Sequence, residues 1–189
     1  MTSLHDFLKK LIKILDDCSV AYMISGSFGS SYHGQPRATK DIDIVIAPTE
    51  EQLLSFVESL GTNYYVNLEA VRDAFTNPSM FNVIDHLSGW KADFILRKNR
   101  EFSRQEFERK RLAEIDGIDV WVTSPEDMIL SKLEWSKERQ SEQQVHDALG
   151  IAVVQWDHLN IGYLRKWAKE LHVQDSLEQL IEQAERLVK

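Results

Sequence analysis

Cysteine and long apolar runs are what this sequence most clearly lacks. Cys18 is the only cysteine in 189 residues, so no internal disulfide can form, and a reducing, cytoplasmic setting is the simplest expectation. No apolar run reaches the length of about 20 residues that a membrane-spanning helix needs. Charged residues interrupt the apolar N-terminal stretch, which also lacks the cleavage site of a signal peptide. We therefore expect a cytoplasmic protein that does not enter a membrane.

Positive charge is also scarce. The chain has 22 Lys and Arg against 30 Asp and Glu, which gives a formal net charge of -8. This balance argues against broad, charge-driven binding of nucleic acid, although a local basic patch is compatible with it. Repeats, low-complexity segments and linkers rich in Gly, Pro or Ser are absent too. Hydrophobic residues make up 43% of the chain, which is enough to build a packed interior.

The hydrophobic periodicity predicts a fold of the α/β (α+β) class, in which helices flank a mixed β-sheet core and a C-terminal helical extension follows. We expect a core over residues 1–123 and a helical region over 124–189 that packs on it. The predicted strands are 20–25, 41–46, 80–86, 90–96 and 118–122. The predicted helices of the core are 3–17, 27–32, 49–60, 67–75 and 101–113, and three or four more follow Ser124.

Two aspartates stand in a segment that otherwise reads as a buried strand. Asp41 and Asp43 alternate with isoleucines, so the strand would place both carboxylates on one face, about 7 Å apart. Ionised carboxylates are costly to keep in such a strand. Magnesium prefers carboxylate, water and phosphate oxygens, so the pair predicts a divalent ion together with a phosphate-bearing ligand. The alternative explanation is that the two aspartates simply form the solvent-exposed face of an edge strand.

A Gly-Ser turn precedes this strand, and a third aspartate follows it. Gly26 allows close approach of the backbone, and the helix after it directs free N–H groups at an anion. The Ser27 hydroxyl could add a hydrogen bond. Asp93, in another apolar strand, is a candidate to accept the proton of an acceptor and to bind metal, with Asp85 a weaker candidate. The plainer alternatives are an ordinary turn and a salt bridge between Asp93 and Lys91.

The order of these motifs resembles a known superfamily. Gly26-Ser27, then Asp41-Ile-Asp43 and a later strand aspartate, is similar to the nucleotidyltransferase superfamily that includes DNA polymerase β. The segment His-Gly-Gln-Pro-Arg-Ala-Thr-Lys at 33–40 is more specific. It resembles small bacterial and archaeal members related to the AbiEii-type toxins and to the minimal or antibiotic-modifying nucleotidyltransferases.

The following helices extend the resemblance. The segment at 124–133 begins a helix, and Lys132, Arg139 and Asp147 match a Lys, an Arg and an Asp that recur in those relatives. The resemblance runs from about Tyr22 to Asp147. The last helices match no family that we can name.

The resemblance implies an enzyme, a metal-dependent nucleotidyltransferase with its core in residues 1–123. A nucleoside triphosphate such as ATP would bind with Mg²⁺ or Mn²⁺, and the metal would lie on Asp41, Asp43 and Asp93. Asp93 would deprotonate the acceptor hydroxyl, a nucleoside monophosphate would pass to that hydroxyl, and pyrophosphate would leave. The residues expected to bind the nucleotide are Gly26, Ser27, Arg37, Thr39 and Lys132.

Two other interpretations stay open. One is a non-catalytic nucleotide-binding or regulatory member of a two-component, toxin–antitoxin-like pair, which would have a cognate protein partner. The other is a different phosphoryl or glycosyl chemistry at an Asp-x-Asp metal site. The sequence does not identify the acceptor, which could be a tRNA end, a protein hydroxyl or a small molecule such as an antibiotic.

Overall fold

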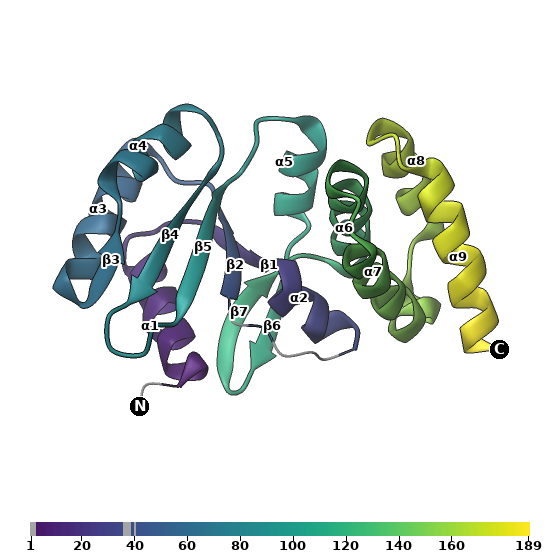
Figure 1. The fold of residues 1–189 in the computed structure, drawn as a ribbon, viewed down its shortest axis with the longest axis horizontal. Coiled ribbons are helices and arrows are strands. Elements are labelled where there is room, and N and C mark those ends of the chain that lie inside the picture. Colours follow the sequence, from purple (N-terminus) through teal and green to yellow (C-terminus); the bar gives the residue numbers. More distant parts are fainter. Residues whose placement is uncertain (1–2, 36–38, 40) are drawn as a thin grey trace. The chain divides into compact units, whose positions relative to one another are not determined.

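The computed structural model describes residues 3–35, 39 and 41–189. Their contacts form two compact units, which are drawn in Figure 1. The first comprises the described residues of Met1–Ser25 and Thr39–Val122, and the second those of Gly26–Ala38 and Thr123–Lys189. The predicted division into residues 1–123 and 124–189 stays a prediction.

The first unit is built on one mixed sheet of seven strands in the order β3-β4-β5-β2-β1-β7-β6 (Figure 1). Two neighbouring pairs are parallel, β2 with β5 and β1 with β7, and the others are antiparallel. The mixed sheet confirms the predicted fold class. The strands are β1 (Tyr22–Ser25), β2 (Asp41–Ile46), β3 (Tyr64–Val66), β4 (Met80–Asp85), β5 (Lys91–Leu96), β6 (Arg111–Ile115) and β7 (Ile118–Val122).

The helices of this unit begin at capping residues that the sequence makes visible. The side chains of Ser3 and Thr49 each accept a hydrogen bond from the backbone N–H three residues later. The side chains of those later residues, Asp6 and Gln52, accept in turn from the backbone N–H of Ser3 and Thr49. These capping boxes satisfy N–H groups that a helix start leaves without partners. The helices are α1 (Leu4–Asp17), α3 (Glu50–Leu60), α4 (Leu68–Thr76), α5 (Glu101–Glu108) and the short 3-10 helix η1 (Gly61–Asn63).

One face of the sheet carries the core of the first unit. Ile42, Ile44 and Ile46 are fully buried. The Phe94 ring lies 4.9 Å from that of Phe56 on α3 and 5.4 Å from that of Phe81, measured between centroids. The isoleucines of β2 therefore point to the core, as the alternation predicts, and the aspartates between them belong to the other face of the strand.

The predicted helix over 101–113 is wrong in its second half. Helix α5 ends at Glu108, and residues from Arg111 form β6, which pairs with β7. The two strands meet at a two-residue turn, where Asp116 and Gly117 have φ of 51° and 78°. Positive φ at both positions is typical of a type I′ hairpin, for which Asp-Gly is a favoured pair. The turn and its cross-strand pairs outweigh the helical propensity of the charged residues. The structure also has a strand, β3, that the sequence does not predict, and it pairs antiparallel with β4.

The second unit is helical. It contains α2 (Gly26–His33), α6 (Pro125–Arg139), α7 (Glu142–Val154), α8 (Ile161–Glu170), α9 (Gln174–Val188) and the 3-10 helix η2 (Trp156–His158). Ser124 caps α6 by accepting from the Asp127 N–H, and Pro125 occupies the first turn, where the missing N–H of proline has no helical partner to lose. The His33 ring at the end of α2 bonds the Thr123 carbonyl at 2.6 Å. Within the described ranges, no helix is long and apolar enough to cross a membrane.

Gly34 lies where α2 ends against α7, and its replacement by alanine is expected to destabilise the second unit. An added Cβ would lie 2.8 Å from the backbone nitrogen of Ile151, so the two segments would have to separate. Overpacking of this kind costs about 1–3 kcal/mol. Urea unfolding of Gly34→Ala measures the loss. Gly162→Ala is the matched control, since its Cβ would meet only the Asn160 side chain at 3.4 Å, and an equal loss there would contradict the explanation.

Candidate active site

The three candidate carboxylates come from two adjacent parallel strands. In the register of β2 and β5, Asp41 lies opposite Lys91 and Asp43 lies opposite Asp93. Neighbouring strands are about 4.8 Å apart, and side chains opposite each other share a face of the sheet. Asp43 also lies opposite Ser25, the last residue of β1. The sheet thus brings all three aspartates to the face that is turned away from the isoleucine core.

Lys91 bridges two of these aspartates. Its Nζ lies 3.3 Å from Asp41 Oδ2 and 3.1 Å from Asp93 Oδ2. Burial opposes the ammonium charge, but hydrogen bonds and attraction from Asp93 and Asp41 outweigh it and raise the pKa of Lys91. The salt bridge between Asp93 and Lys91, given above as the plainer alternative, is therefore present.

Asn82 also belongs to the site, and the sequence analysis does not identify it. Strand β4 places it opposite Asp93, and its side-chain amide donates to Asp93 Oδ1. Because Lys91, two residues earlier on β5, donates to Oδ2, both oxygens of Asp93 accept hydrogen bonds. Exposure of the side chain decreases across the sheet, from 46% for Asp41 to 11% for Asp93. The only sequence signal for Asn82 is its position between two core residues of a strand.

Asp85, the weaker candidate, is engaged elsewhere. Its Oδ1 accepts from the Leu87 N–H at 3.1 Å and its Oδ2 from the Ser88 hydroxyl at 2.5 Å. It stands three residues after Asn82 on β4, so the pleat directs it to the opposite face of the sheet. Asp85 thus caps the turn between β4 and β5 and does not join the other carboxylates.

The Gly-Ser turn begins α2 in the second unit and follows Ser25 directly in the chain. Gly26 has φ of 59°, which a residue with a side chain adopts only at a cost, so the glycine is required by the backbone. Thr39 acts locally, since its hydroxyl donates to the Asp41 carbonyl at 3.0 Å. Arg37, also predicted to bind the nucleotide, lies outside the described residues.

Lys132 is buried in the second unit and paired with an acid. Its Nζ lies 2.9 Å from Asp147 Oδ2, and the two side chains are 4% and 5% exposed. Gln143 donates to the other oxygen of Asp147 at 2.8 Å. Lys132 and Asp147, which the resemblance identifies as matching positions, thus form a buried ion pair that links α6 to α7. The contact of Lys132 with a nucleotide stays a prediction.

The carboxylate face offers ligands for a metal without a complete cage. Among residues 3–35, 39 and 41–189, no three His, Cys, Asp or Glu side chains gather closely enough to hold an ion by themselves. Asp41 and Asp43 nonetheless supply the hard oxygen donors that Mg²⁺ and Mn²⁺ prefer. Magnesium usually takes one or two carboxylates and completes its shell with water and substrate phosphates. The donor set therefore fits an ion that arrives together with a nucleotide.

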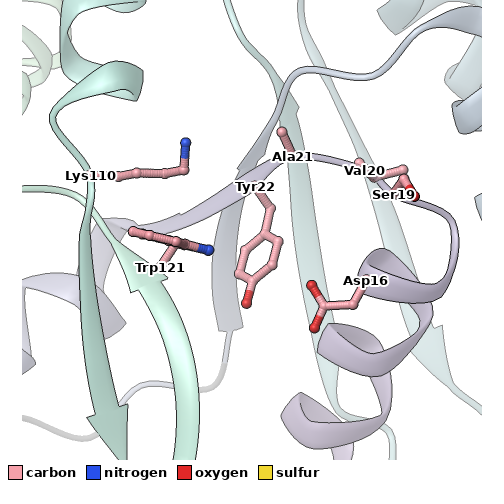
Figure 2. A pocket seen from close by; sticks show the side chains of 7 residues that line it. All are labelled: Asp16, Ser19, Val20, Ala21, Tyr22, Lys110 and Trp121. Carbon is pink, nitrogen blue, oxygen red and sulfur yellow. The ribbon is translucent and has the colours of Figure 1, made fainter.

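A separate pocket of about 290 Å³ lies at the beginning of β1, at the other end of that strand from Ser25. Figure 2 shows the Tyr22 ring between Asp16 and Trp121. Burial, reinforced by the Asp16 charge, raises the pKa of Tyr22 to about 12. Burial and the nearby Arg97 cation lower the pKa of Lys110. The lining residues are Asp16, Ser19, Val20, Ala21, Tyr22, Lys110 and Trp121.

We expect one tyrosine of the folded protein to ionise with a pKa of about 12, and the Tyr22→Phe variant to lack that phase. Since folding raises this pKa above the ordinary value of about 10, the stability that it contributes is complete below about pH 10 and is lost up to about pH 12. Absorbance titration of tyrosinate, with circular dichroism to follow unfolding, measures both. A wild-type titration unchanged in Tyr22→Phe would contradict the assignment.

Several solved nucleotidyltransferases share the fold. An antigenic nucleotidyltransferase-like protein from Paracoccidioides brasiliensis is similar with a TM-score of 0.65 and 16% identity, over 96% of this chain and 88% of that one. The lincosamide antibiotic adenylyltransferase LnuA, solved with lincomycin, gives 0.58 and 13% over 82% and 99%. ANT(2'')-Ia, solved with adenylyl-2''-tobramycin, gives 0.57 and 15% over 88% and 95%. At these identities, the likeness is one of fold.

Comparison of the sequence with protein families identifies the family to which the chain belongs. None of the curated proteins compared with this chain matches it. A family described as nucleotidyltransferase of unknown function (DUF6036) matches residues 1–184, nearly the whole chain. Because that match includes β2, β5 and the Gly-Ser turn, the carboxylate face and the family assignment concern the same part of the molecule. The chain belongs to this DUF6036 family of nucleotidyltransferases.

Proposed function

We propose that this protein transfers a nucleoside monophosphate from a nucleoside triphosphate to an acceptor hydroxyl. The hydroxyl oxygen forms a bond to the α-phosphorus, the bond between that phosphorus and the bridging oxygen breaks, and pyrophosphate leaves. The hydroxyl proton goes to a base of the protein. The reaction needs charge neutralisation on the triphosphate, which Mg²⁺ or Mn²⁺ provides when bound.

The observation that carries the proposal is the common face of Asp41, Asp43 and Asp93 on parallel strands. Asp41 and Asp43 are the proposed metal ligands, and the Asp41 side chain is more exposed than that of Asp93. Asp93 is the proposed base that accepts the proton of the acceptor hydroxyl. It is also proposed as a third ligand of the metal. Their order along the chain, after the Gly-Ser turn, supports the same roles.

The triphosphate is proposed to bind the backbone N–H groups at the start of α2, with Gly26 and Ser27. Thr39 would support this by holding the backbone of Asp41. Arg37 is proposed as a further phosphate contact. Lys132 would act on the nucleotide only if its ammonium exchanges Asp147 for a phosphate.

A small-molecule hydroxyl is the first acceptor class to test. Two of the structural neighbours are solved with lincomycin or with an adenylylated tobramycin, and the net charge of -8 disfavours broad binding of RNA. A tRNA end and a protein hydroxyl are the competing acceptors.

The test uses the four NTPs, each labelled at the α-phosphate, with Mg²⁺ or Mn²⁺, a host extract and a panel of aminoglycosides and lincosamides. The wild type is compared with the Asp41→Asn/Asp43→Asn double variant, and Asp119→Asn, exposed on β7, is the control. Label moved to a small molecule by the wild type and Asp119→Asn alone would support the proposal. Binding of Mg-NTP without transfer to anything would favour a regulatory protein that acts with a partner.

A further inference from the structure

The pocket at the beginning of β1 is separate from the candidate active site and lies within the first unit (Figure 2). Strand β1 begins at Tyr22, which lines this pocket, and ends at Ser25, which lies opposite Asp43. Tyr22 is almost fully buried, whereas Asp16 and Trp121 are exposed. The pocket therefore has an aromatic floor and opens to solvent. Its volume of about 290 Å³ suits a small molecule.

Two side chains of opposite charge line this pocket. Asp16 comes from the end of α1, and Lys110 from the segment between α5 and β6. In Figure 2 they lie on opposite sides of the Tyr22 ring. In the described part of the chain, neither forms an ion pair, with the other or with a third residue. The pocket thus offers one acid and one base to a ligand.

Negative charge gathers on the Asp16 side. Lys13, a cation on the same helix, pairs with Asp17 at 2.7 Å. Partial burial, and next the Asp17 charge, raise the pKa of Asp16, because both disfavour a further negative charge there. A ligand ammonium group at Asp16 would balance this charge and donate charge-assisted hydrogen bonds to the carboxylate.

Positive charge gathers on the Lys110 side. The Lys110 ammonium lies 4.3 Å from the centre of the Phe107 ring, and the Arg97 guanidinium carbon lies 5.6 Å from the same centre. Burial, and next the Arg97 charge, lower the pKa of Lys110, and Glu108 opposes this less strongly. Among the described residues, the buried Nε of Arg97 has no hydrogen-bond partner. A ligand carboxylate at Lys110 would reduce the repulsion between the two cations.

We propose that this pocket binds a small zwitterion, a free amino acid or a short peptide, with its ammonium group at Asp16 and its carboxylate at Lys110. A ligand with both charges matches both sides of the pocket, whereas a ligand with one charge leaves the other side unbalanced. The Tyr22 and Trp121 rings favour a ligand that also carries an aromatic ring. Because the pocket is separate from the carboxylate face, failure of the proposed transfer reaction would leave this proposal standing.

The test titrates isotope-labelled protein with L-phenylalanine and with the dipeptide glycyl-L-phenylalanine. It follows the Trp121 indole N–H signal by NMR, and the Trp121→Phe variant assigns that signal. Phenylpropionate, which lacks the ammonium group, and phenylethylamine, which lacks the carboxylate, are the matched probes. We expect at least one of the two zwitterions to bind at least about tenfold more tightly than either matched probe, since each charge adds a charge-assisted hydrogen bond.

Two variants assign the charges. Asp16→Asn is expected to lower the affinity for the zwitterion at least about tenfold and to leave the affinity for phenylpropionate unchanged. Lys110→Met is expected to lower the affinity for the zwitterion by a similar factor and to leave that for phenylethylamine unchanged. Glu114→Gln and Lys98→Met change exposed charges that do not line the pocket, and these controls should bind as the wild type does.

The tighter of the two zwitterions shows the spacing of charges that the pocket accepts. Equal affinity of the wild type for the zwitterions and for the matched probes would overturn the proposal. So would signal changes that leave Trp121 unaffected, or binding of both zwitterions weaker than about 10 mM. Circular dichroism establishes that each variant is folded.

Discussion

Replacement of Asp43 by asparagine is expected to lower nucleotidyl transfer by at least about 10³-fold, because a neutral amide cannot hold the ion that balances the triphosphate. Asp43 lies opposite both Ser25 and Asp93 in the sheet, so it occupies the centre of the candidate site. Asparagine has nearly the shape of aspartate, so the fold should persist. The rate of pyrophosphate release at saturating Mg-NTP measures the loss.

Two comparisons make this result specific. Asp119→Asn changes an exposed acid on another strand of the same sheet and should leave the rate unchanged. Asp93→Asn should also lose activity, but its defect should lessen as pH rises and the acceptor hydroxyl needs less help from a base. An Asp43→Asn enzyme that works at the wild-type rate would remove the proposed mechanism.

The second large effect is on stability. Lys132→Met is expected to destabilise the protein by about 3–5 kcal/mol, because it removes the ammonium charge that neutralises the buried Asp147 carboxylate. Both side chains are almost fully buried, at 4% and 5% exposure, so water cannot replace the ammonium. Urea unfolding, followed by circular dichroism, measures the change.

The double variant Lys132→Met/Asp147→Leu should recover most of the loss, since apolar residues of similar volume can replace a buried ion pair at little cost. Arg165→Met, which breaks the exposed pair with Glu178, is the control in the same unit and should change stability little. A double variant as unstable as Lys132→Met would show that the charge left behind is not the cause.

The same double variant separates the two roles considered for Lys132. If it folds and binds Mg-NTP as the wild type does, Lys132 serves only to join α6 to α7. If it folds but loses nucleotide affinity, the lysine reaches the triphosphate as the resemblance implies. Isothermal titration with a non-hydrolysable analogue distinguishes the two.

Local sequence patterns predicted several parts of this molecule well. The alternation of Asp41 and Asp43 with isoleucines established which face of β2 is buried, because successive side chains of a strand point to opposite sides. Capping residues such as Ser3, Thr49 and Ser124 marked the beginnings of their helices, since the relevant hydrogen bonds join residues only three apart. The Asp-Gly turn at residues 116–117 is an equally local signal, but the sequence analysis does not use it, and the charged residues before it predict a helix over 101–113.

Only the tertiary structure decided which side chains meet. The bridge from Lys91 to Asp41 depends on the pairing of β2 with β5, strands about fifty residues apart in the chain, and the contact of Asn82 with Asp93 depends on the pairing of β4 with β5. A shift of either register by one residue would turn these side chains to the other face. The sequence by itself determined the types of residue, the strand faces and the nucleotidyltransferase resemblance. The partners of Asp93 and the burial of Lys132 follow from packing between distant segments, which no local pattern encodes.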